Sequence, residues 1–319
     1  MRNEVRIIGM SDIVQAGVTP ADCVRWVEES FRLKHECQLP AKVSVHPYKD
    51  DFITTMPALL PQRFGRFGIK VVSRIDGDVP ALKSDIMLYD STTGRLIAIV
   101  DGDWITAMRT GAVAALAIRT LKSSHADAYS IIGLGNTARA VALCLIAESK
   151  GQAVRFRLLD YKDQAGLFME RFKDVPNVSF EVVGTKEKFF GKAEVVISCI
   201  TSAGDGLLCP DDSLFQKGVL LVPVHTRGFQ NCDLFFDKVF GDDTDQIRGF
   251  KYFPQFRQYD ELHHVLQGKN PGRTSNDERI LSYNYGIALH DIFFASRIYL
   301  RAEGGGGFDI FKQDQKLWF

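Results

Sequence analysis

The sequence predicts an α/β protein built around a doubly wound parallel sheet. From about residue 123, short apolar β-rich runs alternate with helical ones. These runs are almost continuously apolar and end at turns, as is typical of strands buried on both faces. A glycine-rich segment directly after the first run has the form of a strand-to-helix turn. Together these observations favour parallel strands covered by helices on both sides.

The chain before this region mixes helix and strand. A helix is expected over 19–37, because Thr19 can serve as N-cap, Pro20 suits the first helical position and apolar residues recur at helical spacing. A second, alanine-rich helix is expected over 104–121. Runs of β-forming residues bounded by Gly, Pro and Asp predict strands between these helices, at 42–48, 51–59, 68–75, 84–90 and 95–102.

The region after residue 123 supplies the parallel sheet. Helices are expected at about 136–149 and 163–172. From about residue 279, one long helix is expected after a short strand, and Gly304–Gly307 are expected to form a flexible break before a short tail. Apolar runs predict the strands of the sheet at 128–133, 154–160, 178–183, 194–200, 219–224 and 238–243.

Composition excludes several classes of function. The 319 residues include 39 Lys and Arg and 39 Asp and Glu, so the basic footprint of a nucleic-acid binder is missing. We find no signal peptide and no apolar run of about 18 residues, and expect a cytoplasmic protein of about two domains without nucleic-acid or membrane partners. The cysteines lack metal-binding spacing, so we expect free thiols and no metal site at Cys23, Cys37, Cys144, Cys199, Cys209 and Cys232.

The most informative motif is the turn at 128–139, AYSIIGLGNTAR, which has the G-x-G-x-x-A form of a Rossmann turn. Gly133 allows the tight turn, and Gly135 lets the backbone approach a pyrophosphate. The small Ala138 lets helix and strand pack closely. This pattern is weak alone, but here a strand precedes it and a helix follows it.

The residues around this turn predict the kind of dinucleotide. Asn136 and Thr137 lie at the N-terminus of the following helix, which attracts phosphates. Asp160 ends the next strand about 20 residues further on, where a carboxylate bonds a ribose 2′-hydroxyl and repels a 2′-phosphate. The sequence therefore favours NAD(H) over NADP(H). A Rossmann-like domain without a nucleotide stays open as the alternative.

Segments outside this motif resemble the ornithine cyclodeaminase and mu-crystallin family, in the same order and at similar spacing. They are GIKVV at 68–72, AMRTGAVAALA at 107–117, the fingerprint at 133–138 and GIALHDIFFA at 286–295, with further matches at Met56-Pro57 and GRTSNDERI at 272–280. The resemblance covers nearly the whole chain. It implies a Rossmann domain, here 123–278, inserted in an α+β substrate-binding and dimerisation domain, here 1–122 plus 279–319. It also implies a homodimer and L-amino-acid or imine substrates.

The resemblance assigns roles on the substrate side. Lys70 matches a family lysine that lies at the substrate, where burial lowers a lysine pKa and its charge can bind a carboxylate. Lys42 falls where the cyclodeaminases place a carboxylate-binding arginine, and Met56 belongs to the same substrate side. A surface lysine stays open as the alternative for Lys70 and, more seriously, for Lys42. Asp291 matches a family acidic residue and could equally be structural.

The resemblance also assigns residues to the cofactor. Arg109 matches the arginine that opens the RTGA helix and binds cofactor phosphate; a guanidinium at a helix N-terminus opposes the local dipole and so favours an anionic partner. Ser84, by a loose alignment, and Thr201 match positions that contact the cofactor. Val224 and His225 follow the strand at 219–224, and such strand ends face the nicotinamide crevice.

His225 departs from the family pattern. The cyclodeaminases carry an aspartate at this position as their acid or base, whereas a histidine moves protons near neutral pH without a permanent negative charge. The departure favours relatives that oxidise or reduce a C–N bond over cyclodeamination. A structural histidine stays open.

We therefore expect an NAD(H)-dependent oxidoreductase that transfers hydride at Cα of an L-amino acid or its imine. Lys70 and Lys42 would hold the carboxylate, and His225 would exchange the proton. Three alternatives stay open: ornithine cyclodeamination to proline and ammonia, a dehydrogenase for 2,3-diaminopropionate in a siderophore pathway, and a non-catalytic NADH-binding crystallin-like protein. The segment ELHHVLQGKNPGRTSNDERI resembles the siderophore branch at its PGR and DE positions.

Overall fold

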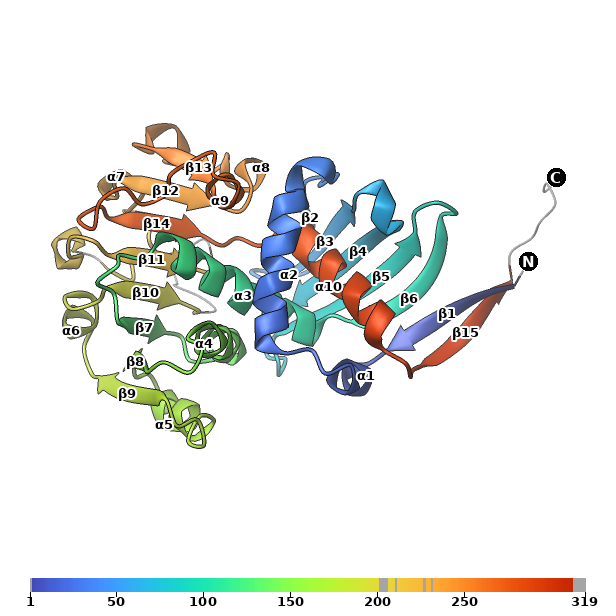
Figure 1. Ribbon diagram of the computed structural model, residues 1–319, viewed down its shortest axis with the longest axis horizontal. Helices are drawn as coiled ribbons and strands as arrows, with labels where there is room; N and C mark the ends of the chain where they lie inside the picture. Colours follow the sequence, from blue (N-terminus) through green and yellow to red (C-terminus); the bar gives the residue numbers. More distant parts are fainter. Residues whose placement is uncertain (1, 201–205, 210, 226–227, 231, 312–319) are drawn as a thin grey trace. The chain divides into compact units, whose positions relative to one another are not determined.

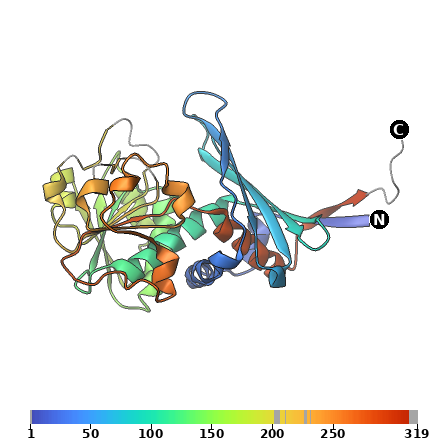
Figure 2. The same cartoon turned by 90° about the horizontal axis from the view of Figure 1, so that it is seen from above.

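The computed structural model describes residues 2–200, 206–209, 211–225, 228–230 and 232–311. The chain forms two compact units, and each contains one sheet (Figures 1 and 2). Unit 1 comprises Met1–Arg109 and Ile287–Phe319, and unit 2 is the intervening Thr110–Gly286. The boundaries differ from the expected 122/123 and 278/279, because unit 2 also takes the second half of the alanine-rich helix and the strand at 280–283.

Unit 1 is built on a mainly antiparallel sheet of seven strands. In spatial order they are β15 (Gly306–Phe311), β1 (Arg2–Ile8), β6 (Arg95–Asp101), β5 (Leu82–Asp90), β4 (Arg66–Arg74), β3 (Phe52–Leu59) and β2 (Val43–Val45). Only the pair β1 and β6 is parallel. The helical segments are α1 (Met10–Gln15), α2 (Pro20–Leu33), η1 (Lys34–Glu36), η2 (Gln62–Phe64), the first part of α3 (Asp103–Leu121) and α10 (Ala288–Arg301).

Local signals and long-range pairing both shape unit 1. Helix α2 begins as expected, because Thr19 Oγ1 accepts a hydrogen bond from the Asp22 amide and the Asp22 carboxylate accepts one from the Thr19 amide. It ends at Leu33, short of the expected residue 37, and η1 continues the chain. The flexible break expected at Gly304–Gly307 is wrong in part, since β15 begins at Gly306 and pairs antiparallel with β1.

Unit 2 is a parallel sheet of eight strands with helices on both sides (Figure 2). Their spatial order is β13 (Tyr259–Glu261), β12 (Lys238–Gly241), β14 (Ile280–Tyr283), β11 (Leu220–Pro223), β10 (Val195–Ser198), β7 (Ala128–Ile132), β8 (Val154–Leu159) and β9 (Val178–Val183). The helical segments are the rest of α3, α4 (Asn136–Glu148), α5 (Gln164–Glu170), α6 (Lys186–Phe190), α7 (Cys232–Phe235), α8 (Thr244–Ile247), α9 (Leu262–Leu266), η3 (Asp212–Leu214) and η4 (Phe253–Gln255). The predicted Rossmann-type sheet, inserted between two parts of a second unit, is confirmed.

The order of the strands locates the crevice of unit 2. Strands β7, β8 and β9 run outward in one direction, whereas β10 and β11 continue from β7 in the other. Sequence order thus reverses between β7 and β10, and ligands of such sheets bind beyond the carboxyl ends of the strands at that switch point.

The expected long helix from about residue 279 is shorter than predicted. Strand β14 is fully buried between β11 and β12, and α10 begins only at Ala288. Gly286 lies between them with φ of 84°, a left-handed conformation that interrupts a helix. In the part of the chain that the structure describes, no helix is long and apolar enough to cross a membrane.

Candidate active site

The turn after β7 has the geometry of a phosphate cradle. Gly133 has φ of 82°, and a Cβ placed on it would lie 2.6 Å from the backbone of Cys199 and Ile200. Only glycine fits where the turn comes so close to the chain beyond β10. A Cβ on Gly135, in contrast, would meet no atom within 4 Å. The backbone at Gly135 therefore faces open space, as the approach of a pyrophosphate requires.

The other fingerprint residues lie as the motif predicts. Gly135 is the N-cap of α4, whose first residue, Asn136, is exposed and whose Thr137 is half-buried. Ala138 is fully buried, so its small side chain lets the helix pack closely. The free N–H groups of this first turn are donors for an anion. These residues fit the diphosphate of a dinucleotide.

Asp160 follows β8, the strand beside β7. Its Oδ1 accepts a hydrogen bond from the Ala165 amide at 3.0 Å, which fixes the carboxylate at the start of α5. This contact does not occupy Oδ2. The carboxylate is therefore both anchored and able to accept hydrogen bonds from a ribose.

His225 lies just past the carboxyl end of β11 and is tied to the neighbouring strand. The Val224 amide donates to the Ser198 carbonyl at 3.0 Å, and His225 Nε2 lies 2.6 Å from Ser198 Oγ at the end of β10. The ring also stacks against Phe229, with centroids 6.2 Å apart. Ser198, which sequence reasoning missed, thus fixes the orientation of the imidazole. Thr201 lies outside the described residues.

A second polar cluster lies inside unit 1. Lys70 on β4 donates to Asp291 Oδ1 on α10 at 2.8 Å, and Arg109 Nε on α3 donates to the same oxygen at 2.9 Å. Lys70 and Asp291 are 0% exposed, and Arg109 is 7% exposed. We call Lys70, Arg109 and Asp291 the cationic cluster, because two cations share one carboxylate oxygen.

The cationic cluster carries an excess of positive charge. Burial and the nearby Arg109 lower the pKa of Lys70 to about 8, against the opposing effect of Asp291. Burial acts to raise the pKa of Asp291, but Arg109 and Lys70 outweigh it and hold that pKa below its usual value. Among the described residues, Asp291 Oδ2 has no hydrogen-bond partner. The Asp103 carboxylate also acts on Lys70 through its charge. Within the cluster itself, two cations share the one carboxylate of Asp291, which favours a further anion.

His290, next to Asp291 on α10, does not add a cation to the cluster. His290 is fully buried, and its Nδ1 lies 2.8 Å from Ser30 Oγ. Burial, aided by Arg109, lowers the pKa of His290 to about 3, so its ring is neutral at physiological pH. The His290–Ser30 contact was not anticipated, since no motif links these residues.

Met56 and Lys42 occupy different positions relative to Lys70. Met56 is buried and pairs with Lys70 across β3 and β4, so the two side chains share a face. Lys42 is half-buried and directly precedes the edge strand β2. The structure therefore brings Met56 to the cationic cluster through the sheet, whereas Lys42 lies on the chain leading to its edge.

The structure shows the local contacts of two residues that the resemblance assigns to the cofactor, Arg109 and Ser84. Helix α3 begins at Asp103, so Arg109 lies well inside it and the expected position at the helix N-terminus is wrong. Its Nε donates to Asp291, so this contact does not involve the terminal Nη groups. Ser84 is buried, with its amide donating to Asp103 and its hydroxyl 2.8 Å from Thr106 Oγ1. These contacts hold Ser84 against the start of α3, and its contact with the cofactor stays a prediction.

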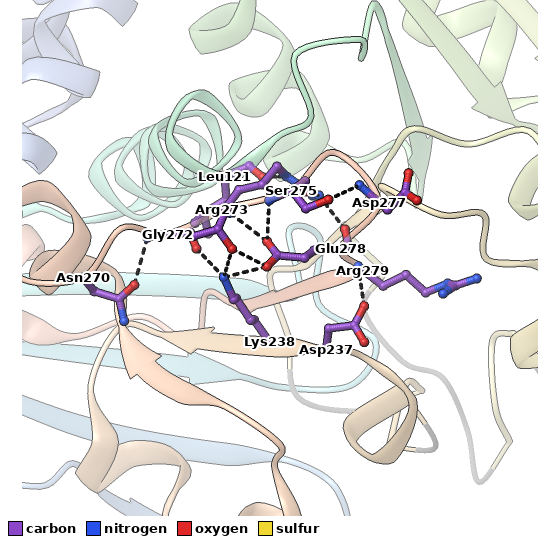
Figure 3. Close-up of polar contacts among 11 residues, drawn as sticks. Leu121, Asp237, Lys238, Asn270, Gly272, Arg273, Ser275, Asp277, Glu278 and Arg279 are labelled. Atoms are coloured by element: carbon purple, nitrogen blue, oxygen red, sulfur yellow. Dashed lines mark hydrogen bonds and ion pairs between the residues drawn. The ribbon is translucent and has the colours of Figure 1, made fainter.

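The GRTSNDER segment (272–279) is held to β12 and α3 by a network of polar contacts (Figure 3). Lys238, the first residue of β12, donates to the Gly272 carbonyl at 2.8 Å and to Thr274 Oγ1 at 3.0 Å, and pairs with Glu278 at 2.8 Å. Arg273 Nε donates to the Leu121 carbonyl at the end of α3. The segment thus clamps the amino ends of the strands, the edge opposite the crevice. These contacts indicate a structural role for the segment.

Comparison with known proteins identifies the family. Residues 5–306 match the model of the ornithine cyclodeaminase/mu-crystallin family. The nodulation efficiency protein NfeD of Rhizobium meliloti is 25% identical over 316 residues, covering 94% of this chain and 96% of the relative. The N-((2S)-2-amino-2-carboxyethyl)-L-glutamate dehydrogenase of Staphylococcus aureus is 26% identical over 274 residues, covering 79% and 80%.

A solved structure shares the fold. The Thermococcus litoralis Δ1-pyrroline-2-carboxylate reductase, in complex with NADH and L-proline, superposes with a TM-score of 0.83 at 21% identity, over 93% of this chain and 97% of that one. The parallel sheet, the fingerprint turn and the match over nearly the whole chain agree. The protein belongs to the ornithine cyclodeaminase/mu-crystallin family.

Proposed function

We propose that the protein is an NAD(H)-dependent oxidoreductase that transfers hydride at Cα of an L-amino acid or its imine. The observation that carries the proposal is the buried cationic cluster, which has one more positive charge than Asp291 neutralises. An α-carboxylate supplies the missing negative charge. The open turn at Gly135 and the anchored Asp160 support a dinucleotide with an unmodified ribose as cofactor.

In this proposal each residue has a defined task. Lys70 and the terminal Nη groups of Arg109 bind the substrate carboxylate, and Asp291 orients both cations. Lys42 adds charge from the sheet edge, and Met56 packs beside Lys70. His225 exchanges the proton at the substrate nitrogen, with its ring held by Ser198. NAD(H), when bound, accepts or supplies the hydride.

Cyclodeamination of L-ornithine is the second candidate, because it uses the same hydride steps and the family takes part of its name from this activity. Ammonia release from L-ornithine with catalytic NAD⁺, followed together with absorbance at 340 nm, separates the two. If the protein is an oxidoreductase, L-ornithine should release no stoichiometric ammonia, and an imino acid should cause NADH to be oxidised. Stoichiometric ammonia without NADH accumulation would establish cyclodeamination, and NADH binding without turnover of any amino or imino acid would indicate a binding protein.

We also propose that the protein is a homodimer formed through unit 1. One face of its sheet packs against α10, whereas the other bears half-exposed apolar side chains, including Phe67, Ile69 and Met87. A groove of about 600 Å³ on this face is lined by Leu59, Phe67, Ile69 and Tyr89. Apolar side chains exposed side by side on one face are typical of an interface.

Light scattering of the purified protein tests the dimer. We expect twice the mass of one chain for the wild type and a single-chain mass for Ile69→Lys. The matched control is Leu300→Lys on α10, where Leu300 is highly exposed and should not affect the mass. A wild-type mass of one chain, or an unchanged Ile69→Lys mass, would argue against this interface.

A further inference from the structure

Asn284 is a buried polar side chain at the crevice edge of unit 2. It directly follows β14, and its amide donates to the Pro223 carbonyl at 3.2 Å, so it lies beside Val224 at the end of β11. The side chain is 3% exposed. Neither Oδ1 nor Nδ2 has a hydrogen-bond partner among the residues that the structure describes.

Two side chains near Asn284 on this edge each make a hydrogen bond within the chain. Ser198 is hydrogen-bonded to His225, and Asp242, after β12, accepts a hydrogen bond from the Gly286 amide at 2.7 Å. Buried amides in folded proteins are almost always hydrogen-bonded, because leaving donors and acceptors without water or partners is unfavourable. The Asn284 amide, which has no partner among the described residues, is therefore suited to hydrogen-bond a ligand.

The strand order indicates which part of a dinucleotide reaches Asn284. Asp160, which suits the adenosine ribose, follows β8 on one side of the switch point between β7 and β10. Asn284 follows β14 on the other side, beyond β10 and β11. The two mononucleotide halves of a dinucleotide occupy opposite sides of such a switch point. The group that reaches β14 is thus at the nicotinamide end.

We infer that the Asn284 amide binds the carboxamide of the nicotinamide ring and so fixes which face of the ring is presented. An asparagine side chain offers one acceptor and two donors, and a carboxamide offers the complementary set, so the two can bond reciprocally. An ionised phosphate offers acceptors only and cannot satisfy Oδ1, and the comparison with ADP-ribose below separates the ring carboxamide from the ribose hydroxyls. This inference rests on the proposed NAD(H) binding and adds the residue that orients the ring.

Binding measurements on Asn284→Leu test the inference without relying on turnover. Leucine has a similar size but no hydrogen-bonding group. Dissociation constants are measured by calorimetry for NADH, for the 3-acetylpyridine analogue of NADH, in which a methyl replaces the carboxamide NH₂, and for ADP-ribose, which lacks the ring. The matched control is Ser282→Ala, because Ser282 is also buried with an unpaired hydroxyl among the described residues and lies on the same face of β14.

We expect Asn284→Leu to weaken NADH binding by about tenfold or more, which corresponds to two lost hydrogen bonds, while ADP-ribose affinity stays within about twofold. Wild type should prefer NADH to the analogue, and the variant should lose this preference. Ser282→Ala should retain it. Unchanged ADP-ribose binding also shows that the variant is folded.

Two results would overturn the inference. One is an Asn284→Leu variant that weakens NADH and ADP-ribose equally, which indicates a structural role. The other is a variant that still distinguishes NADH from its analogue as the wild type does. If the wild type binds neither NADH nor ADP-ribose, the proposed NAD(H) binding is rejected, and the inference is rejected with it. This result differs from the two above, so the two failures can be told apart.

Discussion

The Lys70 ammonium lies 2.8 Å from the Asp291 carboxylate, although 221 positions separate the two residues and both side chains are fully buried. Arg109 shares the same oxygen. A buried pair of this kind is weak evidence for stability, because desolvating the ions offsets much of their attraction. The excess positive charge therefore points to binding rather than to stabilisation of the fold.

Removing the carboxylate that Lys70 and Arg109 share should lower the stability of the fold. Asp291→Asn leaves two buried cations without a counter-ion, so we expect the free energy of unfolding to fall by about 3–5 kcal/mol in urea denaturation. Glu148→Gln is the control, because Glu148 pairs with Arg119 at the surface and its loss should cost no more than about 1 kcal/mol. If both variants lose the same free energy of unfolding, Asp291 does not neutralise buried cations.

Carboxylate binding should weaken at alkaline pH. Because the pKa of Lys70 is lowered to about 8, its ammonium is lost above that pH. We expect the affinity for pyrrole-2-carboxylate, which has no titrating amine, to fall above about pH 8 while NADH affinity stays level. Lys70→Arg keeps its charge and should bind with little pH dependence in this range. A wild-type affinity that is constant from pH 7 to 10 would contradict this role.

The same pKa has the opposite effect on stability. Between about pH 8 and the usual lysine value of 10.5, the unfolded chain binds more protons at this position than the folded one. Lys70 therefore makes the folded state more stable as the pH rises through this window. Urea denaturation of the wild type and Lys70→Met across the window measures the contribution, and parallel pH profiles would contradict it.

Two glycines should respond differently to substitution by alanine. A Cβ on Gly111 would lie 2.5 Å from the Ala140 backbone, where α3 meets α4, so Gly111→Ala should lower stability by about 1–3 kcal/mol. Gly135→Ala should leave the melting temperature nearly unchanged but weaken NADH binding, because its Cβ would occupy the open space of the cradle. A Gly135→Ala variant with wild-type NADH affinity would exclude this turn as the diphosphate site.

The GRTSNDER segment should act on stability and not on ligands. Burial acts to raise the pKa of Glu278, but hydrogen bonds from Lys238 and Thr274 outweigh it and lower the pKa to about 2. Glu278 thus stabilises the folded state above about pH 4.5, and this contribution is lost as the pH falls toward 2. We expect Glu278→Gln to lower stability at pH 7 by about 1–3 kcal/mol and to remove this pH dependence. A change in NADH affinity with unchanged stability would reverse this assignment.

His225 should matter for turnover more than for cofactor binding. We expect His225→Gln to lower kcat by about 10²–10⁴-fold with little change in NADH affinity, because glutamine can still bond Ser198 but cannot exchange a proton. Ser198→Ala should lower kcat less and move the pH profile, and Ser198→Thr should restore it. Full activity of His225→Gln would assign the ring a structural role.

Features encoded within a few residues could be predicted from the sequence. The fingerprint turn and the N-cap of α2 each depend on contacts within a short segment, so spacing and residue type sufficed. The period of apolar residues similarly located most strands of both sheets, with errors mainly at their ends.

Features that depend on contacts between distant parts of the chain could not be predicted from the sequence. Strand β15 exists because it pairs with β1 from the other end of the chain, and nothing near Gly306 signals this partner. The Lys70–Asp291 pair, the Ser198–His225 bond and the unpaired Asn284 amide likewise arise only when separate strands and helices meet. The family resemblance marked Lys70 and His225, but it could not say what each contacts.

A turnover assay on substrates with and without a carboxylate tests the central claim most directly. L-amino acids with NAD⁺ and cyclic imino acids with NADH are followed at 340 nm, each beside its decarboxylated analogue, for example Δ1-pyrroline-2-carboxylate beside 1-pyrroline. The account predicts turnover of at least one carboxylate-bearing compound, none of its analogue, and loss of the difference in Lys70→Met. Equal reduction of both analogues, or no turnover across the panel by protein that binds NADH, would contradict it.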